Sequence, residues 1–252
     1  MSVDSHEKHS PLDQFKLEKV HDDFHIEAAG IDISFTNSSL YMVLATAISI
    51  IFMLYATRKK STTPDRLQVV AESIYNFVYN MVEGSIGKEG KKFFPLVFCL
   101  FIFILMCNVL GITPYSFTVT SHITVTFALA MIAFTTVTIF AIVRNGLLGF
   151  IHMFLPSEVP WWMSPIIFFI EFFSFLIRPI TLSVRLFANM VAGHVLLKVI
   201  ATFVISLGII FGIAPMLFAV IMTGFELFVA VLQSYIFAIL VCAYLGEVTR
   251  QH

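Results

Sequence analysis

Residues 164–203, SPIIFFIEFFSFLIRPITLSVRLFANMVAGHVLLKVIATF, follow a nearly unbroken helical pattern. At 1.5 Å per residue this stretch predicts a helix of about 60 Å, twice the roughly 30 Å of a bilayer's hydrocarbon core. A second such pattern at 215–248 predicts a helix of about 50 Å. Either each pattern is broken into a hairpin, or both helices are strongly tilted and held at a slant by something outside the chain. The pattern alone leaves both alternatives open.

The composition indicates an all-α polytopic membrane protein. Of the 252 residues 58% are hydrophobic and 12% are charged, and the mean hydropathy is +0.91, which is too apolar for a soluble domain. The net charge of −1 gives no reason to expect nucleic acid as a partner. Since all three cysteines lie in apolar runs without metal-ligand spacing, we expect neither disulfides nor a bound metal, and no cofactor is indicated. These cysteines are Cys99, Cys107 and Cys242.

Three shorter apolar runs have the length of single membrane spans, at about 40–57, 93–112 and 122–143. With the two long patterns they predict about five transmembrane helices. A sixth helix, with apolar positions at helical spacing and polar residues between them, is expected within 64–92. It is typical of an amphipathic helix at the membrane interface, and equally of a helix packed on protein outside the membrane. The predicted division of the chain is a polar segment, a first span with its basic stop, the amphipathic helix and a helical bundle, at 1–39, 40–63, 64–92 and 93–252.

Several local signals predict where helices begin and end. One of Asn37, Ser38 and Ser39 is expected to cap the first helix. The amphipathic helix should begin at Pro64-Asp65 and end near Gly84, and Arg144-Asn145-Gly146 should stop the third span.

The basic residues predict the orientation of the chain. Seven of the fifteen Lys and Arg residues lie between the first and second spans, and none lies in the turn at 113–121. The positive-inside rule therefore places 58–92 in the cytoplasm and the N-terminus outside. By parity Arg144 and the C-terminus are inside.

The long helical patterns contain ionisable residues, which are costly in a membrane and therefore indicate function. Glu171, Arg178 and Arg185 are seven residues apart and share one stripe with Ser174 and Asn189. His194 is nine residues beyond Arg185, about 180° around the helix and roughly 13 Å along it, so the two are not simple partners. In the second pattern Glu226 and Gln233 share a face. Arg178 and Lys198 also fit snorkelling toward the interface, whereas Arg185 lies too far from either end for this.

The chemistry available to Arg185 is narrow. A guanidinium stays protonated, so it cannot relay protons, but it favours the ionised form of a carboxyl group brought beside it. No acid within a turn or two on the Arg185 face can be that carboxyl group, so we expect it on another subunit, one able to move away afterwards. His194 and Glu226, by contrast, are titratable groups suited to passing protons.

Two motifs carry a family resemblance. SVRLFANMVAGH at 183–194, followed by FELFVAVLQSYIFAILVCAYLGE at 225–247, closely resembles subunit a of the F-type ATP synthase, the stator of its membrane proton motor. The resemblance covers nearly the whole chain, and NVLGITPYSFTVTSHI at 108–123 is similar to the bacterial branch closest to mitochondria. It implies a bacterial inner-membrane protein with two long tilted helices against a rotating proteolipid ring. The implied partners are that ring, peripheral-stalk subunits and membrane lipid, within a hetero-oligomeric complex.

The resemblance also implies roles for single residues. Arg185 matches the arginine that faces the ring carboxylates and keeps two offset half-channels from short-circuiting. Asn189 matches the asparagine beside it, and Gln233 matches the glutamine that faces the arginine from the last helix. His194 and Glu226 match a pair that lines the outside-facing half-channel.

Two further matches concern the mouths of the half-channels. Glu171 matches an acid of the inside-facing half-channel, and Arg178 and Ser174 are possible accessory residues on its stripe. The family often carries an acid in the turn before the third span, where this chain offers His122. A catalytic role is not expected, because the chain has no GxxxxGK[ST] phosphate-binding loop.

Two other functions compete with this interpretation. One is a self-contained proton-coupled transporter, whose substrate site would use Glu171, Arg185, His194 and Glu226. Inverted repeats with broken helices would favour it, and the sequence shows no internal repeat. The other is a structural subunit of a respiratory complex, in which polar residues only join helices. A stator should copurify with a proteolipid ring and a stalk, whereas a transporter should work alone in liposomes.

Overall fold

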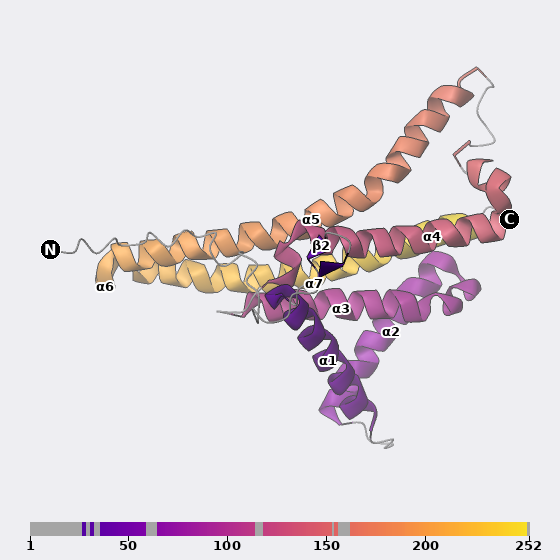
Figure 1. The fold of residues 1–252 in the computed structure, drawn as a ribbon. Coiled ribbons are helices and arrows are strands. Elements are labelled where there is room, and N and C mark those ends of the chain that lie inside the picture. The colour runs from indigo at the N-terminus through magenta and orange to yellow at the C-terminus, as the bar shows by residue number, and fades with distance from the viewer. Residues whose placement is uncertain are drawn as a thin grey trace.

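The computed structural model describes residues 27–28, 31–32, 36–58, 65–113, 118–152, 154–155 and 162–250. Most of the polar segment expected at 1–39 lies outside these residues. Helices dominate, and the only strands in the described ranges are two-residue ones, β1 (Glu27–Ala28) and β2 (Ile31–Asp32), which pair antiparallel. The helices, shown in Figure 1, are α1 (Asn37–Thr57), α2 (Arg66–Ile86), η2 (Lys88–Lys92), α3 (Phe94–Ile112), η3 (Val119–Ser121), α4 (Ile123–His152), α5 (Ser164–Ser206), α6 (Gly208–Phe211) and α7 (Ile213–Arg250).

Five helices of the described ranges are long and apolar enough to cross a membrane, namely α1, α3, α4, α5 and α7. This confirms the all-α membrane fold. Each of the two long patterns forms one helix rather than a hairpin, with 43 residues in α5 and 38 in α7. At 1.5 Å per residue they extend over about 65 Å and 57 Å, so neither fits a bilayer upright.

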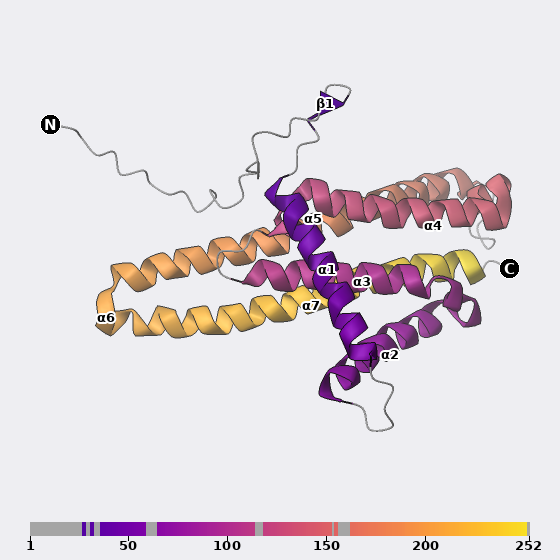
Figure 2. The same ribbon diagram turned by 60° about the horizontal axis from the view of Figure 1, so that its bottom comes forward.

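The part of α5 that adjoins α6 lies beside α7 in the views of Figures 1 and 2, and the short α6 joins the two helices, whereas the beginning of α5 diverges from α7. The turn requires Gly208, whose φ of +70° lies in the left-handed region that favours glycine. Figure 1 shows that α5 is bent along its length, and it contains Pro179. A proline inside a helix removes one backbone hydrogen bond and kinks the helix.

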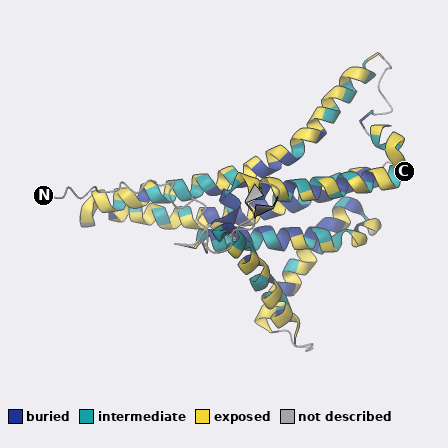
Figure 3. Ribbon diagram, viewed as in Figure 1, coloured by how far each residue is buried: buried dark blue, intermediate teal, exposed yellow. Residues whose placement is uncertain are grey.

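The core lies where α7 packs against α2, α3, α4 and α5. Buried apolar side chains such as Ile104, Leu186, Phe237 and Leu245 form one cluster there. Figure 3 shows the buried residues gathered in this middle region, while the ends of α5 and α7 beside α6 are largely exposed. Those exposed ends are apolar, with Phe203 and Leu217 among them, as expected for surfaces that meet lipid or another membrane subunit.

The amphipathic helix α2 packs on the bundle with one face. Val78 and Val82 of that face are buried, while Leu67 and Val70 are exposed. Asp65 caps the helix by accepting a hydrogen bond from the Arg66 amide.

Several predicted helix ends are displaced in the structure. Helix α2 ends at Ile86, with Gly87 at φ +81°, so the end expected near Gly84 is wrong by two residues. The first helix is preceded by Thr36 as its N-cap, so Asn37 is already helical, and no side-chain cap bond forms. The third span continues to His152, with a break at Gly146, whose φ is +69°. The expected stop is therefore a kink, since only glycine adopts this φ without strain.

Candidate functional site

Arg185 and Asn189 of α5 lie along an open groove between α5 and α7, which has a volume of about 620 Å³. Both side chains are exposed. Glu226 and Gln233 line the same groove from α7, and they are only 6% and 5% exposed. The other lining side chains are almost all apolar. The groove therefore presents one fixed positive charge at its surface and two buried polar groups on its other wall.

His194 and Glu226 face one another across the two helices. His194 Nε2 lies 3.7 Å from Glu226 Oε1, which is too long for a hydrogen bond but close enough for a small movement or one water molecule to connect them. Neither carboxylate oxygen of Glu226 accepts a hydrogen bond from the described residues. A buried carboxyl group without hydrogen bonds is costly, so this arrangement lowers stability, and a carboxyl group beside an imidazole is chemically able to exchange protons.

Gly193 explains how Glu226 fits between the helices. A Cβ atom at Gly193 would lie 2.6 Å from Glu226 Oε1 and 3.0 Å from its Cδ. The absence of a side chain at this position is what admits the carboxyl group beside His194. The group that approaches Gly193 closely is therefore the side chain of Glu226.

A polar path continues from His194 to the turn before α4. The backbone of Gly111, near the end of α3, forms a hydrogen bond with His194. Gly111 also packs against Thr118, since a Cβ atom on Gly111 would lie 2.6 Å from the Thr118 Cγ2 atom. Thr118 Oγ1 donates a hydrogen bond of 2.9 Å to Ser121 Oγ, and both residues are buried. The buried hydroxyl groups of the turn thus lie beside the Gly111 backbone that bonds to His194, and we call this run of polar groups the polar path.

His122 follows these hydroxyl groups directly, at the junction of η3 and α4. It is partly buried, and burial lowers its pKa below the ordinary value for histidine. The imidazole is therefore favoured in its neutral form near pH 7. The structure brings His122 to the turn end of the polar path, but it does not place it in the groove with Arg185.

Arg178 belongs to a separate cluster. Its Nη1 atom lies 3.3 Å from Glu247 Oε2 on α7, and its guanidinium carbon lies 4.5 Å from the centroid of the Tyr244 ring. Snorkelling does not describe this arrangement, because the side chain is held between α5 and α7. Sequence reasoning missed the pair, since Glu247 lies 69 residues further along the chain, on another helix.

Glu171 and Ser174 lie on the part of α5 that precedes Pro179. Neither lines the groove that contains Arg185. The seven-residue spacing predicted one stripe from Glu171 through Arg178 to Arg185, and the structure divides these residues between different surroundings. Arg178 pairs with Glu247, whereas Arg185 forms no ion pair with any carboxylate in the described ranges.

Sequence reasoning also missed Asn108. This side chain is fully buried, and its Nδ2 atom donates a hydrogen bond of 3.3 Å to the carbonyl oxygen of Ala230. It connects α3 to α7 one turn from Glu226 and Gln233. A signal was present in the sequence, because Asn108 is the only side-chain amide in the apolar run 94–112.

No group of three His, Cys, Asp or Glu side chains in the described ranges could hold a metal ion. The arrangement instead suits proton transfer beside a fixed positive charge. The model of the family described as ATP synthase A chain matches residues 39–246. The chain belongs to this family.

The ATP synthase A chain family comprises subunit a of the F-type ATP synthase, so the resemblance to that subunit is confirmed. The chain is a multi-pass membrane protein, a proton-translocating subunit of the stator in the membrane sector of a multi-subunit ATP synthase. The matched range contains the whole groove and the polar path that leads to it.

Proposed function

We propose that this chain is a non-catalytic stator subunit with two offset half-channels, which deliver protons to a rotating proteolipid ring and receive them from it. The observation that carries the proposal is the exposed Arg185 at a groove whose other wall holds buried Glu226 and Gln233. A guanidinium on an apolar surface, without an ion pair in the described ranges, requires an acid from another molecule. A ring carboxylate passing the groove meets that requirement.

The outside-facing half-channel uses His194 and Glu226. A proton that arrives through the turn passes His122 and the neighbouring hydroxyl groups, reaches the His194–Glu226 pair and then protonates a ring carboxylate. The neutral carboxyl group can enter lipid because it no longer carries a charge. Gly193 and Asn108 support the path, because one admits Glu226 and the other holds α3 against α7.

The inside-facing half-channel uses Glu171, with Ser174 and Arg178 as accessory residues. After nearly a full turn of the ring the carboxyl group releases its proton there. Arg185, with Asn189 beside it, then favours the ionised carboxylate between the two half-channels and blocks direct leakage. Each elementary charge that crosses the membrane yields about 2.3 kcal/mol per 100 mV, which drives the rotation.

The proposal includes the position of the chain in the membrane and its neighbouring subunits. The chain lies in a bacterial inner membrane with the N-terminus outside, next to peripheral-stalk subunits, and α2 lies at the cytoplasmic interface. Arg144, just before the kink of α4 at Gly146, forms an ion pair with Glu89, which follows α2. This contact supports the placement of both residues on one side of the membrane.

The decisive experiment replaces Arg185 with alanine and measures ATP-driven proton pumping in membrane vesicles. We expect coupled pumping to be abolished while passive proton leakage is retained, because the guanidinium is the barrier between the half-channels. Arg66→Ala, at an exposed position outside the groove, is the control and should pump normally. Coupled pumping by Arg185→Ala at the control's rate would exclude the proposed role.

A second substitution tests the outside-facing path. Glu226→Gln preserves size but removes the titratable group, so we expect slow proton flow through a complex that still assembles. Glu83→Gln changes an exposed acid of α2 in the same way and should leave the flow unchanged. Equal proton flux in the two variants would remove Glu226 from the path.

A further inference from the structure

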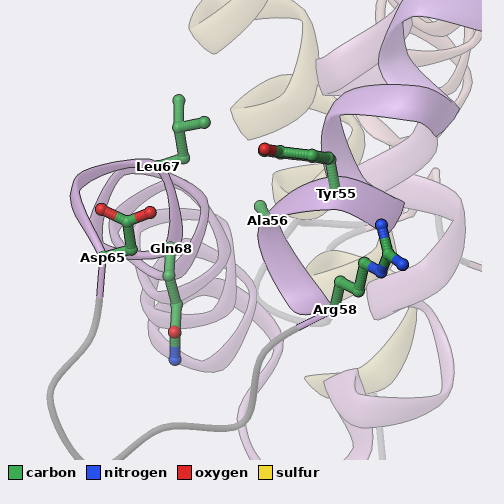
Figure 4. A pocket seen from close by; sticks show the side chains of 6 residues that line it. All are labelled: Tyr55, Ala56, Arg58, Asp65, Leu67 and Gln68. Carbon is green, nitrogen blue, oxygen red and sulfur yellow. The ribbon is translucent and has the colours of Figure 1, made fainter.

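A second cavity lies far from the groove, between the end of α1 and the beginning of α2. It has a volume of about 350 Å³ and is lined by Tyr55, Ala56, Arg58, Asp65, Leu67 and Gln68. Because α1 is a candidate membrane span that ends at Thr57, this cavity lies at the level of the lipid headgroups. Figure 4 shows the α1 residues on one side of the opening and the α2 residues on the other.

Opposite charges stand on the two sides of this cavity. Arg58 belongs to α1 and Asp65 to α2, and both are exposed. They form no ion pair with one another within the described ranges, although both line the same cavity. Asp65 Oδ1 accepts the amide hydrogen of Arg66, which leaves Oδ2 available. Among its described lining residues, the cavity therefore offers one cationic and one anionic group that a single ligand with both charges can engage.

The apolar part of the cavity is suited to the rest of a lipid molecule. Tyr55 is 63% exposed and Leu67 is 43% exposed, so both present surface at the mouth of the cavity. Tyrosine is enriched at this depth of membranes because its ring is apolar and its hydroxyl group is polar. Beyond the mouth, the exposed face of α1 includes Ile51 and Leu54, along which an acyl chain can lie.

We propose that this cavity binds the headgroup of a zwitterionic phospholipid with a primary ammonium group, as in phosphatidylethanolamine. Arg58 and the Tyr55 hydroxyl group donate hydrogen bonds to the phosphate, and Asp65 accepts hydrogen bonds from the ammonium group. An anionic lipid would satisfy Arg58 but leave Asp65 facing a negative charge. A choline headgroup has no N–H to donate to Asp65. The bound lipid would fasten α2 to the end of α1.

The test uses the intact complex in nanodiscs of phosphatidylcholine with a photoactivatable phosphatidylethanolamine as the probe. Crosslinking to the peptides that contain Tyr55 and Leu67 is measured by mass spectrometry. We expect Arg58→Gln and Asp65→Asn each to lower the yield about tenfold, which corresponds to about 1.4 kcal/mol for one charge-assisted contact. Asparagine still caps a helix, so Asp65→Asn leaves the start of α2 intact. The matched control is Arg66→Gln, which should crosslink like the unchanged chain.

Three outcomes would overturn the proposal. Equal crosslinking yields in all variants would show that the cavity does not bind the headgroup specifically. Loss with Arg58→Gln but not with Asp65→Asn, together with full competition by phosphatidylglycerol, would indicate a simple anion site. Absence of crosslinking even in the unchanged complex would show that the lipid does not occupy the cavity. None of these outcomes bears on the proton path, because the cavity shares no residue with the groove.

Discussion

The close contact between Gly193 and Glu226 allows a sharp test of the proton path. In a Gly193→Ala variant the new Cβ atom would lie 2.6 Å from Glu226 Oε1. Ordinary van der Waals contact begins at 3.4 Å, so the carboxyl group has to retreat by about 0.8 Å. As the Glu226 carboxyl group moves away from α5, its separation from His194 grows beyond 3.7 Å. The two groups then no longer form a pair.

The expected size of the effect follows from the packing. Overpacking a filled site costs about 1 to 3 kcal/mol, which corresponds to roughly 5- to 150-fold in a rate. Although Glu226 is only 6% exposed, its side chain lines the open groove, so the carboxyl group can be displaced without disrupting the helices. We therefore expect proton flow through Gly193→Ala to fall by about tenfold or more while the complex still assembles.

The assay compares passive and ATP-driven proton flow in membrane vesicles at equal amounts of assembled complex. Gly224→Ala is the matched control, because it makes the same change on α7 and a Cβ atom there meets nothing within 4 Å. A second change, Glu226→Asp, shortens the side chain and should restore part of the flow to Gly193→Ala. Flow through Gly193→Ala equal to that of Gly224→Ala would refute the reasoning.

Two further predictions concern the packing of α7. In Gly246→Ala the new Cβ atom would meet the Ser85 carbonyl oxygen at 2.5 Å. This oxygen belongs to the backbone of α2, so it cannot rotate away as a side chain can. We therefore expect a loss of about 1 to 3 kcal/mol, measured by thermal unfolding of the complex against Gly84→Ala, which meets nothing. For the Arg178–Glu247 pair, Glu247→Arg alone should lower the melting temperature, and Arg178→Glu in the same chain should restore it. The loss of stability in Glu247→Arg should be about 1 kcal/mol or less, because the pair is partly exposed. If the double variant melts no higher than Glu247→Arg, the ion pair contributes nothing to stability.

The membrane helices could be predicted from the sequence because each depends on local composition. Apolar runs identified all five spans, and the uninterrupted pattern at 164–203 identified the long helix that became α5. The predicted ends of the helices were less accurate. Arg144-Asn145-Gly146 produced a kink rather than a stop, since a glycine with positive φ lets a second helical segment follow.

Contacts between helices were harder to predict, because they depend on the register of α5 against α7. Helical geometry predicted that His194 and Arg185 are not simple partners, but it could not show that Glu226 would lie 3.7 Å from His194. The same limit hid the partner of Arg178, which lies on another helix. Asn108 was visible in the sequence, but its bond to the Ala230 carbonyl depends on how α3 meets α7.

The exposure of Arg185 also bears on the life of a newly made chain. Until another molecule covers the groove, a permanent charge faces hydrocarbon at a cost of at least a few kcal/mol. An unassembled copy in the bilayer is therefore less stable than an assembled one, and we expect it to be degraded selectively. Its abundance in cells should therefore track the supply of whatever surface covers that guanidinium.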